Sequence, residues 1–365
     1  MILKSLRLEN FRNYAAAEFC WDEQVNLICG KNAQGKSNLL EAVCYLGMAS
    51  SFRGATEQEL IRHQADYFYL AAEAATLCGQ LRITAAADRH GRRRWTVNRQ
   101  SYQRLADIVG LFHPVIFAPE DIYLVKAGPD ARRRYLNRQM SQLDRAYCRL
   151  LLSYNHALRQ RNACLKQWEE KPDQEQLAIW SERLATLGGA VSAARQDIVA
   201  RLQPLAAELH AQLSGGETLE LRYQSTPAVM AAGADAAAAA EALQAEFRRL
   251  QQSELRRGLT LAGPHRDELL IRLEGRTARD FASQGQQRTA ALSLKLAELE
   301  LAHTLRGEYP VLLLDDVFSE LDADRCASVL RYAGDRAQTF ISAVDERQPL
   351  PAGKRFLISA GQVCG

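Results

Sequence analysis

The sequence lacks the features that would place it in a membrane or in an oxidising compartment. No stretch of its 365 residues is apolar for long enough to cross a bilayer. The first residues, MILKSLRLENFRNY, carry charges every few positions and include neither the apolar core nor the cleavage site of a secretory signal. The eight cysteines form no C-x-x-C pair, and no histidine stands beside them at zinc-ligand spacing. We therefore expect a cytoplasmic protein with reduced thiols and no membrane partner.

The chain also lacks a strong net charge. Its 46 basic and 43 acidic residues leave a formal charge of +3, which by itself does not indicate a nucleic-acid partner. With 47% hydrophobic and 24% charged residues, it has enough apolar material for one large or two ordinary globular domains. Any surface that binds a polyanion must come from local clusters of basic residues.

Hydrophobic periodicity predicts an α/β chain with a helical middle. Residues 2–20 and 67–97 alternate apolar and polar side chains, as in half-buried strands, whereas the runs VNLIC, VLLL and TFISA are typical of buried strands. After VNLIC, the segment SNLLEAVCYLGMA predicts a helix with one apolar face. Residues 136–158 and 177–209 repeat apolar side chains at steps of three and four, which predicts two long antiparallel helices, the second kinked at Pro204. The alanine-rich segment MAAGADAAAAAEALQAEF predicts a surface helix.

The segment GKNAQGKS matches G-x-x-x-x-G-K-[ST] between a predicted strand and a predicted helix. Glycines in such a loop let backbone N–H groups surround phosphate oxygens. The lysine reaches the outer phosphates, the serine hydroxyl binds Mg²⁺, and the helix N-terminus adds a favourable dipole. The sequence therefore predicts a site for a nucleoside triphosphate. The residues expected to bind it are Gly30, Lys31, Asn32, Ala33, Gln34, Gly35, Lys36 and Ser37.

Two carboxylates follow the apolar run VLLL. Asp315 is expected at a strand end beside the phosphates, where it would bind the metal or its water shell. Asp316 could orient or polarise the water that attacks the γ-phosphate. The alternative is that the pair only caps the next helix.

A polar segment, FASQGQQRTA, stands directly before the apolar repeat ALSLKLAELELAHTL. Its serine fits a helix N-cap, and a serine hydroxyl together with free helix amides offers donors to an anion. The segment lies far beyond the phosphate loop in sequence and shortly before Asp315. Local signals alone leave both interpretations open, an ordinary cap or an anion contact.

The order of phosphate loop, Ser-x-Gly-Gln, apolar strand with two aspartates, and SELD is similar to that of the ATP-binding-cassette (ABC) ATPases. In that class the signature, here Ser283, Gly285 and Gln286, closes over the γ-phosphate bound by a second copy, so a complete site exists only in a dimer. The resemblance makes Asp315 the metal-side carboxylate and places Asp316 where the class usually has glutamate. It makes Ser319–Asp322 the loop that passes between the two sites.

Finer motifs resemble the bacterial RecF family, relatives of the SMC and Rad50 ATPases with a much shorter helical arm. LRLENFRNY, SFRG, APEDIYLVKAGPDARRRYLN, AGPHRDEL and SQGQQRT occur in that family's order over nearly the whole chain. The resemblance implies an ABC-ATPase head of mixed α/β structure formed by residues 1–130 and 258–365. It implies a helical second lobe with a short antiparallel arm over residues 131–257, and it places Asn10–Asn13 near the nucleotide base or ribose.

The same resemblance implies an activity. The family's members are DNA-binding recombination mediators that act in gap repair, replication restart and SOS induction, helping to load recombinase with RecO and RecR. We therefore expect an ATP-dependent homodimer that binds duplex, gapped or junction DNA and hydrolyses ATP weakly, stimulated by DNA. ATP and Mg²⁺ are the implied cofactors, with Lys36 and Asp316 as catalytic residues and Ser37 and Asp315 as metal ligands.

Two departures from the cassette pattern concern the γ-phosphate. Ser342 and Ala343 stand where many cassette ATPases have a switch histidine, and FAPED has no glutamine at the expected Q-loop. The γ-phosphate sensor is therefore unassigned. Slow hydrolysis is expected, because Asp316 is shorter than glutamate and no histidine supports it.

Basic clusters are the candidates for DNA contact, which would be made mainly to phosphates and would depend on salt. Each could instead be a solvated edge or fix the start of a helix, and His265 in GPHRDE is open between a site residue and a turn residue. The candidates are Arg92, Arg93, Arg94, Arg132, Arg133 and Arg134, with Arg248, Arg249, Arg256 and Arg257 as a further group.

Two other classes of protein compete with this interpretation. The ATPase subunit of a transporter would need its signature much closer to the phosphate loop, where this chain has a long helical segment. A small-molecule nucleotide kinase explains the phosphate loop but leaves Ser283–Gln286 and SELD without a role.

Overall fold

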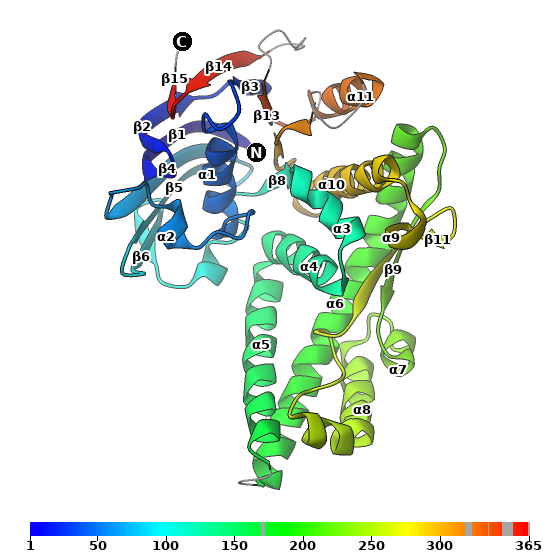
Figure 1. Ribbon diagram of the computed structural model, residues 1–365. Helices are drawn as coiled ribbons and strands as arrows, with labels where there is room; N and C mark the ends of the chain where they lie inside the picture. The colour runs from blue at the N-terminus through cyan, green and yellow to red at the C-terminus, as the bar shows by residue number, and fades with distance from the viewer. Residues whose placement is uncertain (169–171, 318–322, 335, 345–352, 364–365) are drawn as a thin grey trace. The chain divides into compact units, whose positions relative to one another are not determined.

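The computed structural model describes residues 1–168, 172–317, 323–334, 336–344 and 353–363. The chain forms two compact units, the first of Met1–Asp121 with Leu294–Gly365 and the second of Ile122–Ser293 (Figure 1). The helical insertion expected over residues 131–257 lies inside the second unit, which also takes in residues 122–130 and 258–293.

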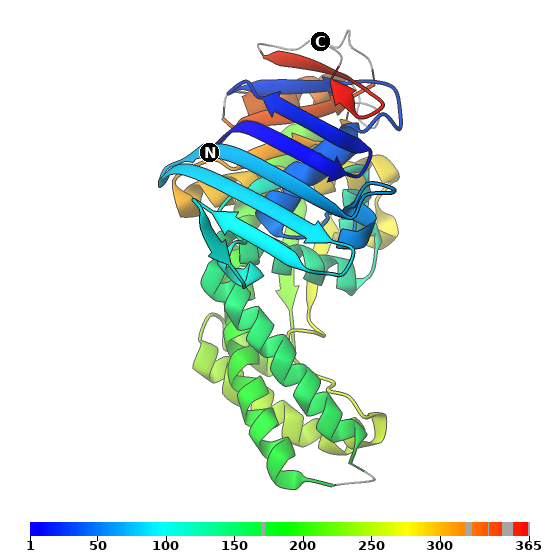
Figure 2. The ribbon, with the colours of Figure 1, turned by 90° about the vertical axis from the view of Figure 1, so that its left-hand side faces the viewer.

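An antiparallel sheet forms one layer of the first unit (Figure 2). The predicted strands over residues 2–20 and 67–97 are confirmed, including the turn in which the Gly91 N–H donates to the Asp88 carbonyl at 3.1 Å. Within the described ranges the strand order is β2-β1-β4-β5-β6-β7. The strands are β1 (Ile2–Phe11), β2 (Tyr14–Cys20), β4 (Tyr67–Thr76), β5 (Gly79–Asp88), β6 (Arg93–Val97) and β7 (Gln100–Tyr102).

A second, mainly parallel sheet carries the segments that lead into the predicted site. Its order among the described strands is β15-β14-β3-β13-β12-β8, with only β15 antiparallel to its neighbour. Every residue of β3, β8, β12 and β13 is buried, as expected for apolar runs without alternation. The strands are β3 (Val25–Cys29), β8 (Pro114–Phe117), β12 (Val311–Leu314), β13 (Thr339–Ala343), β14 (Lys354–Ser359) and β15 (Gln362–Val363).

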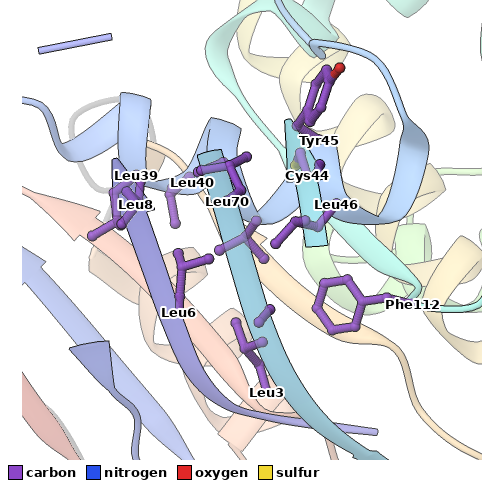
Figure 3. Close-up of a cluster of buried hydrophobic side chains, with 14 of the residues drawn as sticks. Leu3, Leu6, Leu8, Leu39, Leu40, Cys44, Tyr45, Leu46, Leu70 and Phe112 are labelled. Atoms are coloured by element: carbon purple, nitrogen blue, oxygen red, sulfur yellow. The ribbon is translucent and has the colours of Figure 1, made fainter. Parts of the chain in front are cut away.

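Helix α1 (Lys36–Met48) is buried on nearly all sides, so the prediction of a single apolar face was too narrow. It contacts β1 and β4 of the antiparallel sheet as well as β8 and β13 of the parallel sheet. Figure 3 shows Leu39 and Leu40 of α1 facing Leu6 and Leu8 of β1 and Leu70 of β4. Each such buried leucine stabilises the fold by about 1.5–3 kcal/mol. A helix covered from two sheets holds its N-terminus, and the loop before it, in a defined position.

The remaining elements of the first unit are short, apart from the C-terminal part of a long helix. They are α2 (Glu57–Leu60), η1 (Leu105–Asp107), η2 (Pro119–Asp121), α11 (Ala323–Gly334) and the residues of α10 (Gln284–Arg306) from Leu294 onward.

The first predicted long helix of the second unit is interrupted, so the prediction of one helix across residues 136–158 was wrong. Asp144 ends α4 (Pro129–Leu143) and begins α5 (Arg145–Lys166), where its carboxylate accepts from the Ala146 N–H at 2.7 Å. An N-capping aspartate starts a new helix because it satisfies an amide that has no intrahelical partner. The second predicted helix, α6 (Gln174–Ser214), continues on both sides of Pro204.

The alanine-rich segment forms α8 (Ala236–Arg257), which packs closely on α6 and is not simply a surface helix. A Cβ atom at Gly189 would lie 2.5 Å from the Ala240 nitrogen and 2.6 Å from the Ala236 carbonyl oxygen. Only glycine permits this approach of the two backbones. The helices α5, α6 and α8 contact one another, and we call this group the arm (Figures 1 and 2).

A buried polar network joins the arm helices. The Arg161 guanidinium of α5 is 1% exposed and donates to Glu254 at 2.6 Å, to Thr260 at 2.8 Å and to Ser181 at 2.9 Å. His265 lies beside Tyr154 of α5, with 2.6 Å between its Nδ1 and the hydroxyl, and the Arg266 N–H donates to the Gly263 carbonyl at 2.8 Å. The turn interpretation of the GPHRDE segment is therefore confirmed.

A small sheet and short helices complete the second unit. The sheet is antiparallel, in the order β11-β10-β9. These elements are α3 (Ile122–Lys126), β9 (Leu219–Gln224), α7 (Pro227–Ala231), β10 (Glu268–Leu273), β11 (Arg276–Thr277), α9 (Ala278–Phe281) and the start of α10. None of the helices in the described ranges is long and apolar enough to span a membrane.

Candidate nucleotide-binding site

The phosphate loop connects β3 to α1 in a conformation that requires its glycines. Gly30 and Gly35 have φ angles of 152° and 117°. A Cβ atom would lie 2.3 Å from the Ile358 carbonyl oxygen at Gly30, and 2.6 Å from the Asn13 amide nitrogen at Gly35. Helix α1 begins after Gly35 without a side-chain cap, so its first N–H groups are left for a ligand.

Lys36 is the first residue of α1 and is largely buried. Its ammonium group donates to the carbonyls of Gly30 at 2.6 Å and Lys31 at 3.0 Å, and so closes the loop on itself. Burial lowers the pKa of Lys36, and the carboxylates of Asp316 and Asp315 oppose that shift. These hydrogen bonds hold the lysine cation against the carbonyls of the phosphate loop.

Two serine hydroxyls fix the Asp315 carboxylate at the end of β12. Oδ1 of Asp315 accepts from Ser37 Oγ at 2.9 Å and from Ser342 Oγ at 2.7 Å. Asp315 is 5% exposed, and burial raises the pKa of this carboxyl while the two hydroxyl donors lower it. Parallel pairing of β3, β13 and β12 brings these three residues to one sheet edge.

Asp316 follows in a left-handed conformation, with φ of 51°, which aspartate tolerates better than most residues. Its backbone N–H donates to Ser342 Oγ at 2.8 Å. Asp316 lines a cavity of about 240 Å³ together with Lys36, Ser37, Ser342 and Arg53. The structure thus brings together the residues predicted for catalysis and for metal binding, and their roles remain predictions.

These residues suit a nucleoside triphosphate and Mg²⁺. The uncapped amides at the start of α1, the glycine N–H groups and the Lys36 ammonium offer donors and positive charge to phosphates. A serine hydroxyl and a carboxylate in contact are oxygen ligands of the kind that Mg²⁺ prefers, with remaining positions left for water and phosphate oxygens.

The predicted signature begins α10, in the second unit. The backbone N–H of Ser283 donates to the Gln286 side chain at 2.9 Å, and the Gln286 N–H donates to Ser283 Oγ at 3.2 Å. This reciprocal pair is a capping box, so the N-cap prediction is confirmed. Ser283 and Gly285 are exposed. Phe281, immediately before them, is 68% exposed and lines a hollow of about 290 Å³ with Arg276 and Gln286.

The basic clusters differ in how much of their charge reaches the surface. Arg132 is 6% exposed and makes a two-pronged ion pair with Glu268 at 2.7–2.8 Å, while Arg133 donates to Asp130 at 2.5 Å and to the Asp267 carbonyl. These two guanidinium groups hold α4 against the start of β10. Arg134 is exposed, as are Arg92, Arg93 and Arg94. The Arg93 guanidinium pairs with Glu57 at 2.7 Å.

Comparison with known proteins identifies the family. A family model described as the RecF/RecN/SMC N-terminal domain matches residues 2–360. The DNA replication and repair protein RecF of Bacillus subtilis (strain 168) is 39% identical over 345 residues, which cover 94% of this chain and 93% of that protein. The chain belongs to the RecF family. A second RecF, from Listeria monocytogenes serotype 4b (strain CLIP80459), is 38% identical over 370 residues, covering 100% of this chain and 99% of its own length.

Solved structures of the RecF family share the fold. The recombination mediator protein RecF with ATP, in the RecFOR pathway, superposes with a TM-score of 0.92 at 36% identity and covers 100% of this chain and 97% of its own. An SMC head bound to the C-terminal winged-helix domain of ScpA has a TM-score of 0.58 at 15% identity, and this likeness shows the fold alone. The expected α/β ABC-ATPase head with a helical second lobe is thereby confirmed.

Sequence reasoning missed two residues around the phosphate loop of this RecF-family chain, Arg53 and Asn38. Arg53 lines the cavity with its exposed side chain, and its place in SFRG was the only signal. Asn38 donates to the Asn13 side chain at 2.8 Å, and Asn13 donates to the Gln34 carbonyl at 2.8 Å. The turn expected near the base or ribose therefore touches the loop directly. Ser319–Asp322 lies outside the described residues.

Proposed function

We propose that this protein is an ATP-dependent, DNA-binding recombination mediator that acts in gap repair, replication restart and SOS induction. The name of the B. subtilis relative supports a role in DNA replication and repair, and the solved relatives support recombination mediation in the RecFOR pathway. RecO and RecR are the proposed partners, with which the protein helps to load recombinase.

The observation that carries the proposal is the convergence of Ser37, Ser342 and Asp315 at the mouth of a glycine-dependent phosphate loop. A buried carboxylate held by two hydroxyls at this position suits a metal-assisted nucleotide site better than a helix cap. ATP binds along the loop and the N-terminus of α1. Ser37 and Asp315 would hold Mg²⁺, and the ion would supply positive charge beside the phosphates.

Three further groups act on the outer phosphate. Lys36 places its ammonium at the bridging and terminal oxygens, and Asp316 orients the attacking water. Arg53 extends from the cavity wall and supplies a second positive charge there. Hydrolysis is slow because Asp316 is short and no histidine stands at Ser342. DNA stimulates this weak activity by favouring the closed dimer.

The complete site forms between two copies. The exposed Ser283 hydroxyl and the N–H groups of Gln284 and Gly285 stand at the start of α10, where they reach the γ-phosphate bound by the second copy. Phe281, largely exposed beside them, is covered when the copies meet. ATP stabilises the dimer by mass action, because only the dimer makes every contact to it.

Duplex, gapped or junction DNA binds the dimer through phosphates, and ATP hydrolysis releases it. Arg92, Arg94 and Arg134 stay in this proposal because their side chains are exposed, whereas Arg93, also exposed, pairs with Glu57. Arg132 and Arg133 are assigned instead to internal structure, because their guanidinium groups are engaged by Glu268, Asp130 and the Asp267 carbonyl.

Sedimentation velocity with and without ATP·Mg²⁺ tests the proposal. The wild-type chain should shift from monomer to dimer with ATP, and gapped duplex DNA should co-sediment with the dimer. Asp316→Asn should hold the ATP-bound dimer for longer, because binding is kept while hydrolysis slows. A chain that binds ATP yet stays monomeric, with and without DNA, would contradict the proposal.

A further inference from the structure

The exposed side of α5 carries a stripe of basic residues. The exposed residues of this helix that recur at steps of four and three are Arg145, Arg149, Leu152, His156, Arg159, Ala163 and Lys166. The opposite side, which includes Tyr147, Tyr154, Arg161 and Leu165, is buried. We call the exposed set the α5 stripe.

The α5 stripe is straight and of a single charge sign. Positions that repeat every seven residues drift by only about 20° per repeat around an α-helix, so the stripe follows the helix axis. From residue 145 to residue 166 it covers about 31 Å at a rise of 1.5 Å per residue. The 22 residues of α5 contain four arginines, one lysine and one histidine, and neither aspartate nor glutamate. Acidic residues resume only at Glu169, after the helix.

Helix α6 packs beside α5 and adds one exposed arginine next to the stripe. His156 packs edge-on against the Trp180 ring, with 5.8 Å between centroids, and the guanidinium of the exposed Arg183 lies 5.7 Å from the centroid of that ring. The exposed acidic residues in this part of α6 are Glu175 and Glu182. In the part of the chain that the structure describes, no ion pair engages Arg145 or Arg159. Their charges are therefore not neutralised within the fold.

We propose that the α5 stripe binds the phosphate backbone of duplex DNA, an inference that rests on the proposed DNA binding and locates part of it on the arm. Charge complementarity favours this partner. The stripe is about as long as one turn of B-form DNA, roughly 34 Å, with Arg145 and Arg149 toward one end and Arg159 and Lys166 toward the other. Most folded proteins present both charge signs on a surface of this size, and α5 has no carboxylate to pair with basic groups of such a partner. Contacts to phosphates give affinity without sequence preference.

The stripe differs from the clusters that sequence reasoning selected. The guanidinium groups of Arg132 and Arg133 are bonded to other residues of the second unit, and Arg249 pairs with Glu246 at 2.5 Å. Those clusters are conspicuous because their arginines are adjacent in sequence. The α5 stripe is dispersed in sequence and is gathered only by the helix.

The test compares three double variants of the full chain in binding to a duplex of about 40 base pairs, measured by fluorescence anisotropy over a salt series. Arg145→Glu/Arg159→Glu reverses two stripe charges, and glutamate at residue 145 suits the first turn of a helix. Arg201→Glu/Arg222→Glu makes the same change in net charge at exposed positions of the second unit outside the stripe. Arg145→Lys/Arg159→Lys keeps the charges. Sedimentation with ATP but without DNA monitors dimerisation.

The stripe reversal should weaken duplex binding by about tenfold or more and should make the slope of log affinity against log salt shallower by about 2, one for each lost phosphate contact. The control reversal and the lysine variant should stay close to the wild-type chain. Unchanged DNA affinity and salt slope in the stripe variant, with wild-type binding intact, would overturn the inference and leave the stripe to an acidic protein partner. Failure of the wild-type chain to bind DNA would contradict the proposed function instead. If the stripe variant lost ATP-dependent dimerisation in the absence of DNA, the stripe would belong to the dimer interface and the inference would be overturned.

Discussion

Ser342 Oγ donates a hydrogen bond to Oδ1 of Asp315 at 2.7 Å, across the gap between the ends of two parallel strands. Ser342 Oγ also accepts a hydrogen bond from the Asp316 N–H at 2.8 Å. One side chain therefore fixes both aspartates, although it stands where many cassette ATPases carry a histidine. Ser342 therefore positions the two aspartates, although it cannot act as the switch histidine does in other cassette ATPases.

Replacing this serine tests its positioning role. Ser342→Ala should lower ATP turnover by about tenfold, the effect of losing a hydrogen bond to a charged group, while ATP affinity changes less. The expected split arises because Asp315 keeps its bond from Ser37 while the Asp316 N–H loses its acceptor. Steady-state turnover and nucleotide titration measure the two quantities. Equal losses in both would indicate that Ser342 only supports the fold of the site.

The phosphate loop lysine should be required for nucleotide binding. Lys36→Ala removes the buried cation that the loop carbonyls hold, and ATP affinity should fall by at least about a hundredfold, the effect of about 3 kcal/mol. Lys31→Ala is the matched control, because the Lys31 side chain is exposed and the loop uses only its backbone carbonyl, which accepts from Lys36. Equilibrium titration with a fluorescent ATP analogue measures both. Similar affinities for the two variants would sink the phosphate-loop assignment.

The signature serine should matter for association and not for the first binding step. Ser283→Arg places a bulky cation on an exposed position, so ATP binding should be kept while ATP-dependent dimerisation is lost. Loss of the cap should cost about 1 kcal/mol of helix stability. Gln252→Arg adds the same side chain at an exposed position of α8 and should dimerise normally. Persistent dimerisation of Ser283→Arg would exclude a contact in trans.

The buried ion pair of the arm predicts a non-additive stability effect. Arg161→Met leaves Glu254, which is 0% exposed, without its charged partner and should lower the free energy of unfolding by about 3–5 kcal/mol. Arg161→Met/Glu254→Leu removes both charges and should recover most of that loss. Urea unfolding followed by circular dichroism compares the two. A double variant less stable than Arg161→Met would show that the hydrogen bond from the Leu261 N–H to Glu254, at 2.8 Å, outweighs the cost of the unpaired charge.

Local signals predicted the parts of the site that are continuous in sequence. The phosphate loop is eight consecutive residues, and its two glycines stand where the backbone conformation and close neighbours leave no room for a Cβ atom, so a sequence pattern is enough to find it. The N-cap at Ser283 is also set by neighbouring residues. The bond between Ser342 and Asp315 was missed because it depends on which strands pair and in what register. Arg53 was missed because its approach to the cavity follows from the loop after α1.

Packing against distant partners explains the errors in the fold. Apolar spacing runs on across Asp144, so periodicity alone could not separate α4 from α5, although aspartate is a frequent N-cap. The alanines of α8 suggested a surface helix because their packing partner, Gly189, lies on α6. Small residues on two helices indicate a close crossing only when both are seen together.

In the proposed dimer, each ATP site is completed by a second copy of the chain. The most direct test mixes Lys36→Ala with Ser283→Arg, two variants expected to hydrolyse little ATP alone. In a mixed dimer, the intact phosphate loop of the Ser283→Arg copy faces the intact signature of the Lys36→Ala copy, and one complete site is restored. We predict that the mixture hydrolyses ATP well above the sum of the separate variants. A mixture no more active than that sum, with both variants folded and Ser283→Arg still binding ATP, would contradict it.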